Sequence, residues 1–196
     1  MISVTEAAEI NVGDTVVVQG LGLLGLYGCA IAKSRGAARV IALDPVQSRL
    51  DVAKRFGADV TIDVSKLTDA DLIAQVREMA LPDGADVVIE VCGVPQVVAA
   101  GIQMLRVGGK YVLAGFVGPG AGINIDAHDL VKKWITLRGI HNYHPRHLIQ
   151  ALDFVMANRD RFPFREIVDS KFGLDELDDA FEKAANHEVL RAAVVP

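Results

Sequence analysis

The chain has 196 residues, of which 51% are hydrophobic and 23% are charged, and its formal net charge at pH 7 is −5. These values are typical of one globular domain with a small addition, and the negative charge argues against a nucleic-acid partner, because phosphate binding needs a basic surface. Apolar runs are too short to span a membrane and the two cysteines form no disulfide framework, so we expect a cytoplasmic protein without a membrane partner.

Short β-branched runs alternate along the chain with segments whose apolar residues recur at helical spacing. We predict strands, in chain order, at residues 15–19, 40–43, 60–62, 86–91, 110–114 and 135–140, with Gly108 and Gly109 as a turn before the fifth. Helices are predicted from Leu23 to a stop at Gly36, and over residues 48–56, 69–79, 95–106 and 126–134. This alternation predicts an α/β Rossmann fold, a doubly wound six-stranded parallel sheet with helices on both faces.

From Pro145 onward the regular alternation stops. The spacing predicts a helix around residues 148–155, an extended piece over 166–172, a helix over 174–186 and a closing strand over 189–195. We therefore divide the chain into a Rossmann domain, residues 1–144, and a short C-terminal α/β tail, residues 145–196, that packs on it.

A glycine cluster, GLGLLG at residues 20–25, lies between the first predicted strand and the first predicted helix. In this context Gly20 permits a tight turn, Gly22 lets a pyrophosphate approach the helix N-terminus, and Gly25 lets the helix pack on the strand. Asp44 ends the next strand, where it can accept both hydroxyls of an adenosine ribose and would repel a 2′-phosphate. The pattern therefore favours NAD over NADP.

Two other interpretations stay open at this point. The glycines can serve only turns and packing, with Asp44 an ordinary strand-end acid. A methyltransferase that binds S-adenosylmethionine also uses a glycine loop and a strand-end acid, although the third glycine, Gly25, and the sixth parallel strand count against it.

The stretch GDTVVVQGLGLLGLYGCAIAKSRGAARVIALD resembles the cofactor-binding domain of zinc-dependent medium-chain alcohol dehydrogenases. The likeness continues through KRFGADVTID, ADVVIEVCG, LRVGGKYVLAG and FGLDELDDAFEKAANHEVLRAAVVP, and the loop HNYHPRHL further resembles a branch associated with phosphonate catabolism. The resemblance implies these cofactor-binding positions: Gly20, Leu21, Gly22, Leu23, Leu24 and Gly25 at the pyrophosphate, with Leu24 near the nicotinamide; Asp44 and Arg49 at the ribose; Cys92 and Gly93 on the adenine side; Ala114, Ile140 and Asn142 near the nicotinamide; and Arg191 at the phosphates.

In the family, the catalytic zinc is held by a domain that precedes the cofactor domain. The resemblance thus implies NAD as the cofactor of this chain, zinc only in the full-length parent, and no catalytic or metal-binding residue here. The parent would transfer a hydride between NAD and a small alcohol or its aldehyde or ketone, as a homodimer formed through the edge strand at 135–140. We expect the isolated chain to bind NAD(H) without turnover. The alternative is a stand-alone NAD-binding regulatory or scaffold module.

Three histidines, His141, His144 and His147, follow the sixth predicted strand. Three imidazoles in a cluster can bind a metal ion or act as acid and base. Pro145 interrupts their spacing, and we favour a polar loop and the start of a helix. We interpret Cys29 and Cys92 as small packing residues.

Overall fold

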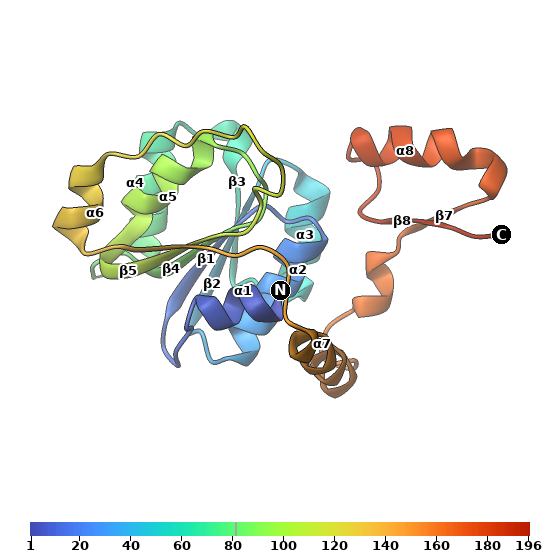
Figure 1. Cartoon of the computed structure of the whole chain (residues 1–196), viewed down its shortest axis with the longest axis horizontal. Helices are drawn as coiled ribbons and strands as arrows, with labels where there is room; N and C mark the ends of the chain where they lie inside the picture. The colour runs from blue at the N-terminus through green and yellow to red at the C-terminus, as the bar shows by residue number, and fades with distance from the viewer. Residues whose placement is uncertain (81) are drawn as a thin grey trace.

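The computed structural model describes residues 1–80 and 82–196. Its centre is a six-stranded sheet in the order β3-β2-β1-β4-β5-β6, and every neighbouring pair is parallel (Figure 1). The strands are β1 Thr15–Gln19, β2 Arg39–Asp44, β3 Val60–Asp63, β4 Ala85–Glu90, β5 Leu105–Leu113 and β6 Thr136–Gly139. The strand order reverses between β1 and β4, as in a Rossmann fold, so the predicted fold class is confirmed.

Helices cover both faces of the sheet (Figure 1). On one face lie α1 Ile2–Ala7, α2 Leu23–Ser34, α3 Gln47–Arg55 and α7 Pro145–Ala157, and on the other lie α4 Asp69–Met79, α5 Gln96–Met104 and α6 Ala127–Lys133. A short 3-10 helix, η1 Val64–Lys66, joins β3 to α4. Among the described residues, no helix combines the length and apolar content that crossing a bilayer requires.

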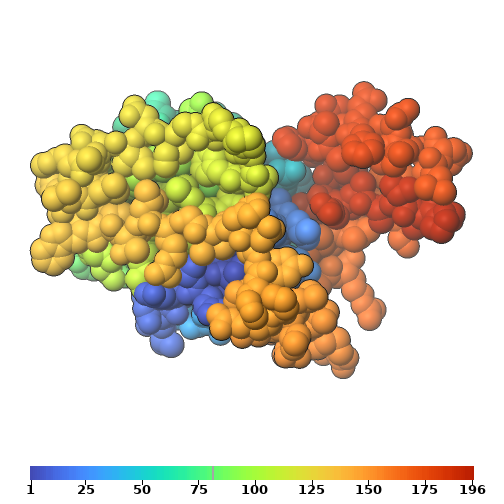
Figure 2. Space-filling view, viewed as in Figure 1, coloured from blue at the N-terminus to red at the C-terminus, as the bar shows by residue number. Residues whose placement is uncertain are grey.

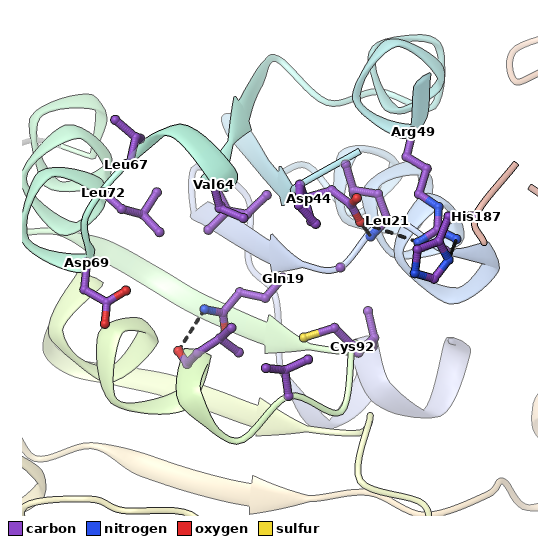
Figure 3. A pocket seen from close by; sticks show the side chains of 17 residues that line it. Gln19, Leu21, Asp44, Arg49, Val64, Leu67, Asp69, Leu72, Cys92 and His187 are labelled. Atoms are coloured by element: carbon purple, nitrogen blue, oxygen red, sulfur yellow. Dashed lines mark hydrogen bonds and ion pairs between the residues drawn. The ribbon is translucent and has the colours of Figure 1, made fainter. Parts of the chain in front are cut away.

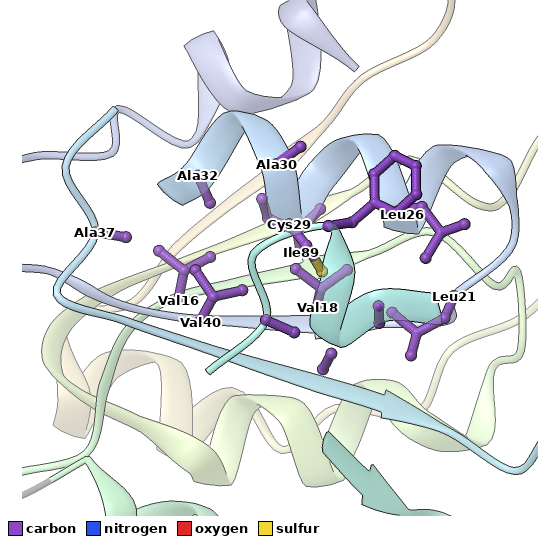
Figure 4. Packing of buried hydrophobic residues seen from close by; sticks show 14 of the residues in the cluster. Val16, Val18, Leu21, Leu26, Cys29, Ala30, Ala32, Ala37, Val40 and Ile89 are labelled. Carbon is purple, nitrogen blue, oxygen red and sulfur yellow. The ribbon is translucent and has the colours of Figure 1, made fainter. Parts of the chain in front are cut away.

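The sheet separates two apolar cores because alternate residues of each strand point to opposite faces. Val16 and Val18 of β1 pack with α2 and α3, whereas Val17 packs with α4 and α5. Figure 4 shows the first of these cores, in which Cys29 of α2 lies among Val18 and Ile89. Both faces of β1 are thus buried, which fixes the strand and the loop that follows it.

The tail has two parts that differ in how they pack. The part that includes α7 and the 3-10 helix η2 Phe164–Ile167 packs on the first core, where Phe164 lies 5.8 Å from Phe56, measured between ring centroids. The remainder consists of β7 Ser170–Phe172, the 3-10 helix η3 Leu174–Glu176, α8 Leu177–Ala185 and β8 Ala192–Val194. In it β7 and β8 form a parallel pair over a small core of their own, and Figure 2 shows this part as a separate lobe.

Several predicted element boundaries were wrong. Helix α1 was not predicted, because its N-cap Met1 makes no side-chain capping bond and no local signal marks it. The turn predicted at Gly108 and Gly109 is an irregularity inside β5, where the pairing register with β4 shifts. The piece predicted to be extended over 166–172 begins within η2, the helix predicted over 174–186 starts as η3, and the closing strand is shorter than 189–195.

Candidate functional site

A cleft of about 500 Å³ opens at the carboxyl ends of β1, β2 and β4, where the strand order reverses (Figure 3). Ligands of open α/β sheets bind at this kind of switch point. The cleft is lined by Gln19, Gly20, Leu21, Gly22, Leu43, Asp44, Pro45, Arg49, Val64, Leu67, Asp69, Leu72, Val91, Cys92, Val94, Val97 and His187. Its residues are mostly apolar at one end, near Leu67 and Leu72, and charged at the other, near Asp44 and Arg49 (Figure 3).

The glycine loop is shaped by steric limits at two positions. Gly20 has a φ of +94°, and a β-carbon there would lie 2.7 Å from the Cβ of Cys92. A β-carbon on Gly25 would lie 1.8 Å from the carbonyl oxygen of Gly20. Only glycine therefore allows β1 to turn so closely under the start of α2.

Gly22 differs, because no atom of residues 1–80 and 82–196 lies within 4 Å of the position that its β-carbon would take. Gly22 is the N-cap of α2, and this helix start has neither a side-chain cap nor an acidic residue in its first turn. Unsatisfied N–H groups and the positive end of the helix dipole thus face open space. A pyrophosphate fits this arrangement of donors and free volume.

Asp44 connects the end of β2 to the glycine loop. Its side chain is 3% exposed, one carboxylate oxygen (Oδ2) accepts a hydrogen bond from the N–H of Leu21 at 2.7 Å, and the other (Oδ1) accepts from the N–H of Val46 at 2.9 Å. The guanidinium of Arg49 lies 4.0 Å from Oδ2, measured from Nη1. A buried carboxylate is thereby held at the edge of the cleft with a cation beside it.

Glu90, at the end of β4, was not predicted as a site residue. It is fully buried, and its carboxylate accepts backbone N–H groups from Cys92 at 2.7 Å, from Gly93, and from Gly115 at 3.2 Å. These bonds join the loop after β4 to the loop after β5. Loss of hydration, together with the Glu90 carboxylate, raises the pKa of the Cys92 thiol to about 11, so this cysteine is protonated at neutral pH.

His187, which follows α8, is a second residue of the cleft that was missed. Its Nδ1 accepts a hydrogen bond from Nη2 of Arg49 at 3.1 Å, since a guanidinium can only donate. The two residues are 138 positions apart in the chain. A contact between residues this far apart leaves no local pattern in the sequence. The turn at Glu90 is local, but the sequence marks it only by an acidic residue shortly before Cys92 and Gly93.

The predicted cofactor positions separate into groups. The cleft brings together Gly20, Leu21, Gly22, Asp44, Arg49 and Cys92. Leu23 and Leu24 line another cavity, of about 240 Å³, between α1, α2 and α7, while Gly25 is buried in α2. The other predicted positions lie outside the cleft lining. Gly93 contacts the Glu90 carboxylate, and Ala114 and Ile140 pack against the first core. The carbonyl of Asn142 accepts a hydrogen bond from Ser3 Oγ, and the N–H of Arg191 donates one to Asp169.

Two of the three histidines after β6, His144 and His147, take part in starting α7, which confirms the predicted helix start. Nδ1 of His144 accepts from the N–H of Arg146, and Nδ1 of His147 accepts from the N–H of His144. Nε2 of His147 lies 3.1 Å from Oε2 of Glu6 in α1. Within residues 1–80 and 82–196, no three His, Cys, Asp or Glu side chains are grouped as metal ligands.

Comparison with known proteins shows the family that this chain resembles. Residues 24–157 match the model of a family described as zinc-binding dehydrogenase. The chain is 32% identical over 173 residues to 5-exo-hydroxycamphor dehydrogenase of Pseudomonas putida, covering 88% of this chain and 48% of that protein. It is 33% identical over 185 residues to D-xylulose reductase A of Aspergillus niger, covering 93% of this chain and 50% of that protein.

A solved structure gives the same picture. The crystal structure of an alcohol dehydrogenase from Thermotoga maritima superposes with a TM-score of 0.90 at 28% identity, covering 100% of this chain and 53% of that one. The chain belongs to the zinc-binding dehydrogenase family, and it corresponds to the nucleotide-binding domain of these enzymes. It spans about half the length of the relatives that it matches. The family match leaves the methyltransferase alternative without support.

Proposed function

We propose that this chain binds NAD(H) in the cleft at the switch point of its sheet. The proposal depends on one observation, which is that Leu21 links Gly22 to Asp44. Gly22 lies at an open helix N-terminus, which suits the pyrophosphate, and Asp44 supplies a buried carboxylate next to it, which suits the ribose hydroxyls. The apolar walls near Leu67 and Leu72 suit the adenine ring.

The choice of NAD over NADP follows from the charge of Asp44. A 2′-phosphate placed at the ribose would bring a second negative charge against this carboxylate, and Arg49 offers one positive charge to compensate both. Titration of the chain with NADH and NADPH, followed by the fluorescence of the reduced nicotinamide, tests the choice. We expect NADH to bind at least tenfold more tightly, and equal affinities would contradict it.

The nicotinamide end of the cofactor is proposed to lie toward Leu24, Ala114, Ile140 and Asn142, and Arg191 is proposed to reach the phosphates. These assignments rest on family resemblance. Gly93 and Cys92 would then border the adenine side, where the carboxylate of Glu90 fixes their backbone. The spectrum of bound NADH, compared between wild type and an Ile140→Ala variant, tests whether the nicotinamide ring lies near Ile140.

We further propose that the whole protein is an NAD-dependent alcohol dehydrogenase. The dinucleotide would supply hydride chemistry: an alcohol becomes an aldehyde or ketone by losing a hydride from carbon to NAD and its hydroxyl proton to solvent, and the reverse reaction returns both. The residues of this chain would bind and orient the dinucleotide, and a zinc ion would be held by residues outside it. The isolated chain, supplied with NAD, zinc and primary or secondary alcohols, should therefore produce no NADH above background. Zinc-dependent NADH production would contradict this division of roles.

A homodimer formed through β6 is the proposed assembly. This strand is the edge of the sheet, pairs with β5 along one side, and all four of its residues are exposed. Trp134, just before it, is 77% exposed. Edge pairing with a second copy would continue the sheet across two subunits. Sedimentation should give a dimer for the chain and a monomer for Leu137→Asp; a monomeric wild type would contradict the proposal.

A further inference from the structure

A chain of polar contacts runs from the tail to the glycine loop. Nδ1 of His187 accepts from Nη2 of Arg49 at 3.1 Å, Nη1 of Arg49 lies 4.0 Å from Oδ2 of Asp44, and that oxygen accepts from the N–H of Leu21 at 2.7 Å. Figure 3 shows these four residues together at one end of the cleft. One residue of the tail is thus connected to the loop that would hold the pyrophosphate.

Arg49 has few other contacts to hold it. Its Nε is buried and has no hydrogen-bond partner among residues 1–80 and 82–196, so the orientation of the guanidinium depends on His187 and on the longer ion pair with Asp44. A long flexible side chain with so few contacts loses its orientation easily. His187 is therefore the shortest contact that keeps the cation of Arg49 beside the ribose carboxylate.

The backbone of His187 gives an independent observation. Its φ is +60°, in the left-handed region where glycine is the least strained residue, and its N–H donates to the carbonyl of Ala184. A side chain kept at a left-handed position often has a specific role, because the backbone conformation alone would favour glycine. Here the imidazole contacts Arg49 and lines the cleft.

The packing between α3 and the tail is loose at this point. A cavity of about 400 Å³ lies between them, lined on the α3 side by Val52 and on the tail side by Val189. Two polar pairs bridge the gap, Arg49 with His187 and Arg55 with Glu166. Apolar residues of the tail, Ile167 and Leu190, pack against the first core nearby, and the Arg49–His187 bond is the polar contact that joins the tail to the edge of the cleft.

We propose that His187 is a positioning residue for dinucleotide binding, which orients Arg49 beside Asp44 and so couples the tail to the adenosine end of the cofactor cleft. Nδ1 of His187 accepts from Nη2 of Arg49, and this contact holds the guanidinium on the side of the cleft where Asp44 lies. The inference rests on the proposed binding of NAD(H). Beyond the glycine loop and Asp44, it adds His187 to the site. It also adds a coupling between the tail and the Rossmann domain.

The test is a double-mutant cycle on the 196-residue chain, with the NADH dissociation constant and the urea unfolding midpoint measured for each variant. We expect His187→Ala to weaken NADH binding three- to tenfold, and His187→Gln to stay within about twofold of wild type, because its amide oxygen can accept from Arg49. Arg49→Ala should weaken binding at least as much, and Arg49→Ala/His187→Ala should bind no more weakly than Arg49→Ala alone. His128→Ala, on exposed α6, is the matched control and should leave affinity unchanged.

Three results would overturn the proposal: His187→Ala binding NADH like wild type, losses that multiply in the double variant, or His187→Gln behaving like His187→Ala. A lower unfolding midpoint with unchanged NADH affinity would assign His187 to stability alone and would also contradict it. If the wild-type chain binds no NADH, the proposed function itself fails, and this outcome is separate from any effect of the variants.

Discussion

A β-carbon added at Gly25 would lie 1.8 Å from the carbonyl oxygen of Gly20. This oxygen is backbone at the turn that ends β1, and the turn is fixed from the other side by Cys92. Neither the carbonyl oxygen of Gly20 nor the added β-carbon of Gly25 can move away without shifting β1 or α2. The closeness of the two glycines therefore determines where the positive end of α2 lies relative to the sheet.

Gly25→Ala should disrupt both the fold and the site. Overpacking against backbone costs on the order of 1–3 kcal/mol, and we expect the free energy of unfolding to fall by at least that amount. NADH affinity should fall more than tenfold, because the helix start moves. Urea unfolding and a fluorescence titration measure the two effects, and wild-type stability would show that the loop is less tightly packed than described.

Gly22→Ala separates binding from folding. Its φ is −67°, and the added methyl group would meet no atom within 4 Å in the part of the chain that the structure describes. The free energy of unfolding should change by less than about 1 kcal/mol. NADH affinity should nevertheless fall at least tenfold, since the methyl group occupies space needed by the phosphates. Unchanged affinity would mean that no phosphate approaches Gly22.

Asp44→Ala should remove the preference for NADH over NADPH while weakening the binding of NADH. It removes the acceptor for the N–H groups of Leu21 and Val46, and leaving such groups unpaired costs about 1–3 kcal/mol each when they are buried. NADH affinity should fall more than tenfold, and the NADPH-to-NADH affinity ratio should rise toward one. Asp63→Ala, at the end of β3 and outside the cleft lining, is the matched strand-end control and should leave the ratio unchanged.

The buried thiol of Cys29 predicts a loss of stability in alkali. Burial in the first core raises the pKa of Cys29 to about 12, so the unfolded chain releases this proton from about pH 9 while the folded chain keeps it. Stability should therefore fall as pH rises from 9 toward 12, by roughly 1.4 kcal/mol per pH unit, and be unaffected below 9. Urea midpoints at pH 8 and 10 should differ more for wild type than for Cys29→Ala. Equal differences would contradict the prediction.

Local signals in the sequence were sufficient for much of the sheet and for part of the site. The glycine spacing before a helix, followed by Asp44 at the next strand end, indicated residues that the structure places together in one cleft, and their roles toward phosphate and ribose stay predictions. The start of the helix predicted over 69–79 was also right, because the hydroxyl of Thr68 accepts from the N–H of Asp71 and caps α4. These features are set by neighbouring residues, so a linear pattern reveals them.

Features that depend on distant packing could not be predicted in this way. His187 reaches the cleft only because α8 and β8 place it beside α3, and α1 forms by packing on α2 and α7 rather than by capping. The irregularity at Gly108 depends on the register between β5 and β4. In each case the partner lies far along the chain, where periodicity gives no information.

Calorimetric titration of the 196-residue chain with NADH, NADPH and S-adenosylmethionine is the decisive experiment on the cleft. We expect one NADH site per chain, weaker binding of NADPH and no binding of S-adenosylmethionine. If neither dinucleotide binds, or if S-adenosylmethionine binds in their place, the assignment of the cleft to NAD(H) is contradicted.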